Sequence, residues 1–249
     1  MTGTNNNPGG FTRRVPSLLQ TGEDSAAAFD GSGSSGGTEI RIPDDDALNT
    51  GAHDNKTISL WFNAFSIGAS PQVLYEQGGN TRGINIYVEE VNGVDTLFMA
   101  AWNQNESNWG DPPIFVSTPI KEGQVYNAVF VLEGDPDGNN GTDAGFVRGF
   151  LDGMEFAEAM GAGNLRAHGD NPAIGGIDNN ARFADNSTMS NGANFVGIID
   201  EVALYNTALS GSQILTQFDA AQPPIPEPAT ATLTALALAG LVVRRRRTV

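Results

Sequence analysis

Apolar and polar residues alternate along much of the chain, in short runs that predict β-strands. From Ile58 to Ala64 an apolar side chain occupies every second position, which would place these side chains on one face of a strand. Runs of β-branched and aromatic residues also lie at 84–91, 97–102, 125–132 and 146–151. Pairs such as Asn92-Gly93 lie between them and favour tight hairpins, because both residues adopt positive φ readily.

One helix is predicted near residues 210–218. Ser210 and Gln213 have the spacing of a capping box, and Ile214, Leu215 and Phe218 supply an apolar face. The many predicted strands have no helices between them, which indicates an all-β fold built as a two-sheet antiparallel sandwich. We expect the helix to pack against this sandwich.

The composition changes after residue 221. Four prolines within residues 222–228 predict a stiff linker, residues 229–243 contain no charge, and an arginine block follows. Fifteen helical residues span about 22 Å, which makes this apolar stretch a marginal membrane span. The sequence therefore divides into a flexible segment (1–24), a β domain (25–221), a linker (222–228) and a tail (229–249).

Composition and charge exclude several classes of function. Of the 249 residues 31 are glycine, above the usual ~7%, which is typical of a turn-rich β protein. Nine basic and 28 acidic residues precede Pro226, so the main domain would repel phosphate backbones and we expect no nucleic-acid partner. The chain has no cysteine, which excludes disulfides and thiolate metal sites.

The end of the chain resembles a bacterial sorting signal. Pro226, Glu227 and Pro228 precede the apolar stretch, and the arginines that follow it are Arg244, Arg245, Arg246 and Arg247. This order is similar to the PEP-CTERM signal. The resemblance implies export, transient anchoring in the inner membrane, processing by an exosortase, and delivery to the cell surface or extracellular matrix. Positive charge stays on the cytoplasmic side of a membrane, so the acidic domain would lie outside.

Two points bear on that interpretation. Proteins of this kind normally carry an N-terminal signal peptide, whereas the first 25 residues contain no apolar run of the ~7–15 residues that a signal needs. Either the protein is not exported or the sequence lacks its true beginning, and we expect the latter. The alternative for the apolar stretch is a helix that completes the core of the domain.

The main domain resembles the LamG-like, concanavalin A-like jelly roll. Residues 28–31 and 40–43 are similar to the opening strand pair of that family, and residues 149–153 to a hairpin with an Asp-Gly turn. The segment 195–206 and the following Ala208-Leu209-Ser210 are similar to its closing strand and helical turn. The resemblance covers roughly residues 25–220 and implies a jelly-roll sandwich with one short C-terminal helix.

Asp200 is the main candidate for a metal ligand. In a regular strand it would share a face with Ile198, Val202 and Leu204, and a carboxylate on an apolar face must be hydrogen-bonded, paired or metal-bound. The family often binds structural calcium through a closing-strand aspartate and groups near the opening strand, which implies Asp200 with Asp30. Calcium takes ~6–8 oxygen ligands, so two carboxylates are only part of a site. The alternative is that Asp200 accepts backbone amide hydrogens at a strand bulge.

Two tryptophans are candidates for a sugar-binding platform. Trp102 and Trp109 flank an amide-rich loop that contains Asn105, and sugars present both apolar faces and hydroxyl edges. Trp109 is the better candidate, because Trp102 ends an apolar strand. The alternative is that each ring fills the core.

These observations predict an exported, non-enzymatic domain that binds carbohydrate or another surface polymer. A structural or adhesion module without a small-ligand site is the alternative. Glucanases with this sandwich carry carboxylates in a Glu-x-Asp-x-x-Glu strand, and the sequence contains no such spacing, so glycoside hydrolysis is the least favoured function.

Overall fold

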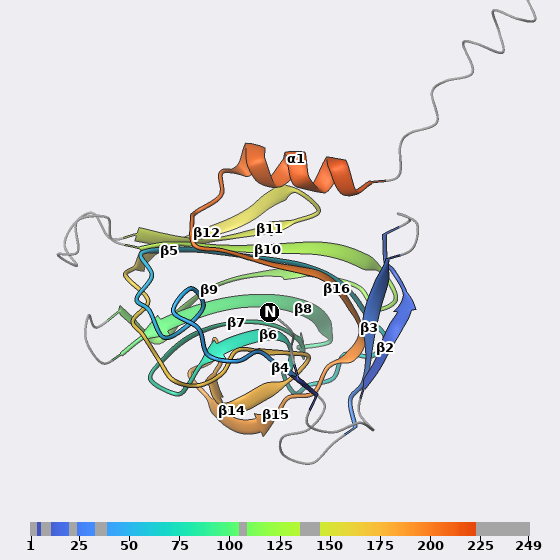
Figure 1. The fold of residues 1–249 in the computed structure, drawn as a ribbon, viewed down its shortest axis with the longest axis horizontal. Coiled ribbons are helices and arrows are strands. Elements are labelled where there is room, and N and C mark those ends of the chain that lie inside the picture. The colour runs from blue at the N-terminus through green and yellow to red at the C-terminus, as the bar shows by residue number, and fades with distance from the viewer. Residues whose placement is uncertain are drawn as a thin grey trace, which may run out of the picture.

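Two antiparallel sheets face each other across an apolar core in a computed structural model (Figure 1). The structure describes residues 4–5, 11–19, 24–32, 39–104, 109–134 and 145–222. Every strand pair among these residues is antiparallel. The predicted two-sheet jelly-roll sandwich is therefore confirmed.

The first sheet contains seven of the described strands. In spatial order they are β1 (Thr4–Asn5), β4 (Ile40–Arg41), β13 (Ala173–Ile174), β6 (Gln72–Gly78), β7 (Arg82–Val91), β8 (Val94–Asn103) and β9 (Trp109–Pro119). Its outer face is partly covered by the hairpin of β14 (Ile177–Arg182) and β15 (Thr188–Gly192). Ile177, Ala181 and Phe183 of this hairpin region pack on Val73 and Tyr87 of the sheet.

The second sheet also contains seven described strands. Their order is β12 (Met154–Ala162), β11 (Gly145–Leu151), β10 (Val125–Glu133), β5 (Asn55–Ala64), β16 (Val196–Tyr205), β3 (Ser25–Asp30) and β2 (Phe11–Pro16). The predicted alternation at 58–64 lies in β5, whose Ile58, Leu60 and Phe62 are fully buried in the core. One face of this strand is buried against the first sheet. An alternation of apolar and polar residues indicates a strand with one buried face.

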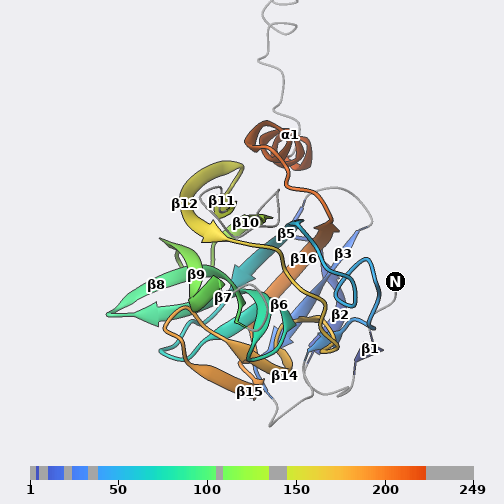
Figure 2. The ribbon, with the colours of Figure 1, turned by 90° about the vertical axis from the view of Figure 1, so that its left-hand side faces the viewer.

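The two long edges of the sandwich differ. At one edge β9 and β12 lie side by side and close the core, as Figure 2 shows. At the other edge the short strands β4 and β13 face β2, β3 and β16, and a pocket opens between them. The open edge is therefore where a ligand can approach the core.

Helix α1 (Gly211–Ala221) packs on the outer face of the second sheet (Figures 1 and 2). Ser210 and Gln213 form the predicted capping box, and Ile214 is buried against Val129 and Val131. Among the described residues no helix is long and apolar enough to cross a membrane. The linker from residue 223 and the predicted tail at 229–249 lie outside the described residues.

The N-terminal segment departs from its prediction. Residues 11–16, expected to be flexible, form β2 and pair with β3 at the edge of the second sheet. The strand reads FTRRVP and is mostly exposed, so it lacks the alternation that marks a half-buried strand. The prediction of a flexible segment over 1–24 is therefore wrong for these residues.

Candidate functional site

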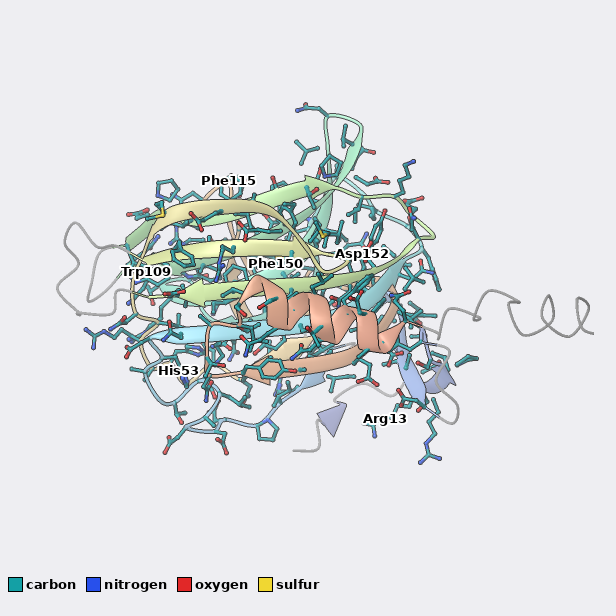
Figure 3. All side chains as sticks on the ribbon, turned by 90° about the horizontal axis from the view of Figure 1, so that it is seen from above. Arg13, His53, Trp109, Phe115, Phe150 and Asp152 are labelled. Atoms are coloured by element: carbon teal, nitrogen blue, oxygen red, sulfur yellow. The ribbon has the colours of Figure 1, made fainter. Side chains whose placement is uncertain are left out.

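Both predicted platform tryptophans are buried. Trp102 is 1% and Trp109 is 6% exposed, and their indole N–H groups donate to the carbonyl oxygens of Gly79 (2.9 Å) and Asn164 (3.1 Å). A sugar stacks on an exposed ring face, and neither ring offers one. The predicted platform is corrected accordingly: both rings fill the interior, and Figure 3 shows Trp109 at the opposite end of the sandwich from Arg13.

Several other predicted residues are not described by the structure. Asn105, the third member of the predicted platform, lies in the gap at 105–108. The sorting residues Pro226, Glu227, Pro228 and Arg244 to Arg247 lie beyond residue 222.

Asp30 and Asp200 are not brought together. Asp30 pairs with Val196 in the β3–β16 ladder, four residues before Asp200, which corresponds to roughly 13 Å along the strand. The Asp30 carboxylate accepts a hydrogen bond from the backbone N–H of Ser32 (2.8 Å), and hydrogen bonds with the Ser32 side chain and with this N–H lower the pKa of Asp30. These two carboxylates therefore do not form the predicted calcium pair.

Asp200 instead holds the N-terminal segment in place. Its Oδ2 accepts hydrogen bonds from Ser17 Oγ and the backbone N–H of Leu18, both at 2.8 Å, and its Oδ1 accepts from the N–H of Glu201 at 3.0 Å. The register of β16 on β5 is irregular between Asp200 and Ala203, and Glu201 has φ 49°. The alternative interpretation, acceptance of backbone amide hydrogens at a strand bulge, is confirmed.

The bulge also changes which face Asp200 occupies. Asp200 lies opposite Trp61 of β5, whose ring stacks on Phe218 of α1 on the outer side of the sheet. Val202 packs against the core on the other side. The expectation that Asp200 shares a face with Val202 is therefore wrong, because an extra residue reverses the alternation.

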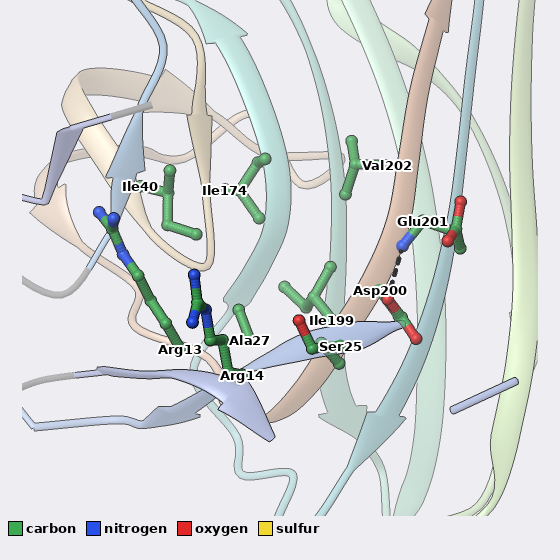
Figure 4. Close-up of a pocket in the computed structure, with 11 residues that line it drawn as sticks. Arg13, Arg14, Ser25, Ala27, Ile40, Ile174, Ile199, Asp200, Glu201 and Val202 are labelled. Carbon is green, nitrogen blue, oxygen red and sulfur yellow. Dashed lines mark hydrogen bonds between the residues drawn. The ribbon is translucent and has the colours of Figure 1, made fainter. Parts of the chain in front are cut away.

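A pocket of about 410 Å³ occupies the open edge of the sandwich (Figure 4). Its apolar lining comes from both sheets and consists of Ala26, Ala27, Ile40, Ile174, Ile199 and Val202. Its polar lining comes from Arg13, Arg14, Ser25, Asp200 and Glu201. An apolar floor with a few convergent polar groups is the usual composition of a small-ligand site.

A second bulge directs two arginines to this pocket. Arg13 lies opposite Ala27, whereas Val15 lies opposite Ala26, so Arg14 is the additional residue in β2. Consecutive side chains of a regular strand point to opposite faces, yet both guanidinium groups line the pocket and extend toward Ile40 in Figure 4. Arg14 has φ 61°, a conformation that costs a non-glycine residue of order 1 kcal/mol or more.

The acidic residues form a group on the β16 side of the pocket. Carboxylate oxygens of Asp24, Asp200 and Glu201 lie within 4.8 Å of one another. A hydrogen bond between the side chains of Asp24 and Glu201 raises the pKa of Glu201 to about 7, with burial and the charges of Asp24 and Asp200 as further causes. The same hydrogen bond lowers the pKa of Asp24. The pair therefore shares a proton near neutral pH.

Three neighbouring aromatic rings lie elsewhere, on the outer face of the first sheet, and one of them is exposed. The Phe115 side chain is 41% exposed, its ring lies 6.0 Å from that of Phe98, and Phe98 stacks on Tyr87 at 4.9 Å. These residues alternate with core residues such as Met99 and Val116, so their runs are apolar on both faces. Periodicity does not assign a face to a continuous apolar run, so the sequence did not reveal this strip of rings.

The pocket arginines were missed for a different reason. Arg13-Arg14 is a visible basic pair in an acidic chain, and that contrast is the signal that could have marked it. The distance in sequence between this pair and the other pocket residues hides their proximity, because β2 reaches them only by pairing with β3.

Comparisons with known proteins agree with this architecture. Residues 24–215 match the model of the concanavalin A-like lectin/glucanases superfamily, the fold type expected from the sequence. No curated protein sequence matches the chain significantly.

Solved structures share the fold at low sequence identity. Domain 4 of an extracellular arabinanase from Geobacillus stearothermophilus, solved with arabinotriose, has a TM-score of 0.55 at 17% identity, over 86% of this chain and 85% of that one. The botulinum neurotoxin serotype G binding domain has a TM-score of 0.59 at 7% identity, over 88% of this chain and 46% of that one. The botulinum neurotoxin DC binding domain, in complex with SialylT, has a TM-score of 0.54 at 10% identity, over 85% and 46%.

Proposed function

This chain belongs to the concanavalin A-like lectin/glucanase superfamily, and on that basis we propose that its β domain is a non-catalytic carbohydrate-binding module. The observation that carries the proposal is the pocket at the open edge, where apolar residues of both sheets lie beneath polar side chains of β2 and β3. A sugar ring has apolar C–H faces and polar hydroxyl edges, and this lining matches both.

The fold relatives support the proposal. The arabinanase domain was solved with arabinotriose and the neurotoxin DC domain with SialylT, so proteins of this fold hold saccharide ligands. The proposal for this chain depends on its own pocket, because identities of 17% and 10% indicate a shared fold rather than shared sites.

The geometry of the acidic group supports a binding role over hydrolysis. Glycosidases hold two carboxyl groups about 5–5.5 Å apart when retaining and about 6.5–9.5 Å apart when inverting, with the scissile bond between them. Asp24 and Glu201 hydrogen-bond to each other, and their oxygens lie within 4.8 Å. A pair that bonds to itself does not flank a substrate bond.

The test is a titration of the full chain with soluble glycans, namely arabinotriose, a β-glucan oligosaccharide and trigalacturonic acid. Ser25→Trp places an indole at the pocket from an exposed position, and Ser70→Trp makes the same substitution in an exposed loop. We expect Ser25→Trp to abolish glycan binding and Ser70→Trp to retain it. Equal binding by both variants would rule out this pocket.

The adhesion alternative has its own outcome in the same experiment. If the wild-type chain binds none of the glycans, the result favours a structural or adhesive role without a saccharide site. A reducing-sugar assay on the same glycans tests hydrolysis, and we expect no release.

We also propose that the protein is exported and reaches the cell surface or extracellular matrix after exosortase processing. Support comes from the sequence, where Pro226-Glu227-Pro228, an apolar stretch and four arginines follow each other. Expression of the chain behind an added signal peptide, in a host with an exosortase, should yield a mature protein that ends near the tripeptide by mass spectrometry. Substitution of the four arginines by glutamine should prevent that cleavage.

A further inference from the structure

We propose that the open-edge pocket selects saccharides that carry a carboxylate, such as uronic acid residues, through the guanidinium groups of Arg13 and Arg14. This inference rests on the proposed carbohydrate function and adds the chemical class of the ligand. The two side chains line the same pocket although they are adjacent in β2.

The charge at the pocket differs from that of the rest of the chain. The chain has a formal net charge of −16, and the two neighbouring arginines at the pocket are an exception to that balance. An acidic protein repels anions in general, so a site that serves neutral sugars has no need of paired guanidinium groups. Arginine binds carboxylates through two parallel N–H···O bonds, which gives both strength and orientation.

The backbone of Arg14 is strained. Arg14 has φ 61° at a bulge, a conformation that glycine or asparagine adopts at lower cost. The bulge has a clear consequence, since it brings a second guanidinium group to the face that Arg13 already occupies. The Arg14 side chain forms no hydrogen bond or ion pair with the described residues, so no such contact holds its guanidinium group at the pocket.

The acidic residues near the pocket bond to other groups. Asp200 Oδ2 accepts from Ser17 and Leu18 on the outer side of β16, and Asp24 and Glu201 bond to each other. In Figure 4 the Glu201 carboxylate lies on the opposite side of the view from the arginines. The arginine end of the pocket is thus the place for an anionic group, with Ile40 and Ile174 beneath the sugar ring.

The test compares a ligand that carries carboxylates with its methyl ester, which has no charge. The full chain is titrated with trigalacturonic acid and with its methyl ester, in which each carboxylate is neutral. We expect the acid to bind about 10- to 100-fold more tightly than the ester, as is typical for hydrogen bonds to a charged group. Added salt should weaken the binding of the acid.

Three variants locate the effect. Arg14→Gly removes the guanidinium group while glycine keeps the positive φ, so a loss of binding is not a loss of fold. We expect it to weaken acid binding about 10-fold or more and to leave ester binding nearly unchanged, with Arg14→Lys intermediate. Lys121→Ala removes one positive charge from an exposed turn between β9 and β10 and should change neither.

The outcomes separate this inference from the proposed function. Equal affinity for acid and ester, or equal acid binding by wild type and Arg14→Gly, would overturn the inference while glycan binding stands. If no glycan binds the wild-type chain, the proposed function itself fails.

Discussion

Ser17 and Asp200 join the N-terminal segment to the closing strand of the sandwich. The Ser17 hydroxyl lies 2.8 Å from Asp200 Oδ2, the backbone N–H of Leu18 donates to the same oxygen, and the Asp200 residue is only 5% exposed. This contact spans 183 residues of sequence. It follows directly after β2, so it also fixes the strand that carries Arg13 and Arg14 to the pocket.

We expect Asp200→Ala to destabilise the fold by about 2–3 kcal/mol, because it removes three hydrogen bonds to a buried charge and leaves donors without an acceptor. Urea denaturation at pH 7 measures the loss. Asp30→Ala, at the exposed end of β3, should cost less than about 0.5 kcal/mol. Because Asp30 and Asp200 do not converge, we expect the Asp200 contribution to be the same with added calcium and with a chelator. A loss of stability in Asp200→Ala that is seen only with added calcium would contradict this expectation.

Substitution by glycine should have opposite effects at the two neighbouring arginines. Arg14→Gly relieves a left-handed backbone at φ 61°, and we expect stability to stay equal or rise by up to about 1 kcal/mol. Arg13→Gly introduces glycine into a regular pair with Ala27 and should cost about 0.5–1 kcal/mol. The thermal unfolding curves of the two variants measure this difference. An equal loss of stability at both positions would argue against a bulge at Arg14.

The tryptophan that was expected to bind sugar should instead matter for stability. Trp109→Ala removes a ring that packs in the core and donates to Asn164, and we expect a loss of about 3–5 kcal/mol. Phe115→Ala, at a 41% exposed ring, should cost much less. At a temperature where Trp109→Ala is still folded, its glycan titration should match that of wild type. If the folded Trp109→Ala variant does not bind glycan, Trp109 is part of the ligand site after all.

The strands and the helix could be predicted because each depends on nearby residues. Alternation in 58–64 reflects one buried face of β5, and Ser210 with Gln213 satisfies the helix N-terminus locally. The bulges could not be predicted, because the alternation of side chains along a strand does not show where an extra residue is inserted. Arg14 and Glu201 both have positive φ at such positions, and one bulge reversed the expected face of Asp200.

The environment of the tryptophans depends on distant segments. Trp102 is covered through its contact with Gly79 and Trp109 through its contact with Asn164. Neither partner can be read from the loop that the tryptophans flank, so their sequence context suggested exposure. The same limit applies to the pocket, whose lining brings β2 to β4, β13 and β16.

Glu201 should make stability depend on pH. Its pKa is raised to about 7 in the folded state from an ordinary value of 4.5, so the folded chain binds more protons than the unfolded chain between these values. The stabilisation is fully present below about pH 4.5 and is lost as the pH rises through 7. Glu201→Gln does not titrate, so the stability of wild type relative to this variant should fall from pH 5 to pH 8. Urea denaturation at each pH measures it, and Glu158→Gln, exposed on β12, serves as the matched control. A constant difference across this range would contradict the shared proton.

Lys56 should make stability rise with pH, in contrast to Glu201, and at higher pH values. The residue is fully buried, its ammonium group donates to the carbonyl of Leu48, and burial lowers its pKa to about 8. Because the charged form is disfavoured in the folded state, the unfolded chain binds more protons between pH 8 and the ordinary value of 10.5. Stability from this residue should therefore rise as the pH increases across that interval.

Lys56→Met keeps a long side chain without the charge, and Gln77 Nε2 remains 3.4 Å from the Leu48 carbonyl. We expect the variant to be more stable than wild type at pH 7 by about 1 kcal/mol or more, since apolar replacements of buried charges are often stabilising. The difference should shrink as the pH approaches 10, where wild-type Lys56 is neutral in the fold. Lys121→Met, on an exposed turn, should show neither the gain nor its pH dependence. A destabilised Lys56→Met at all pH values would mean that the bond to Leu48 outweighs the cost of burying the charge, and that residue 56 anchors the 44–54 loop through its ammonium group.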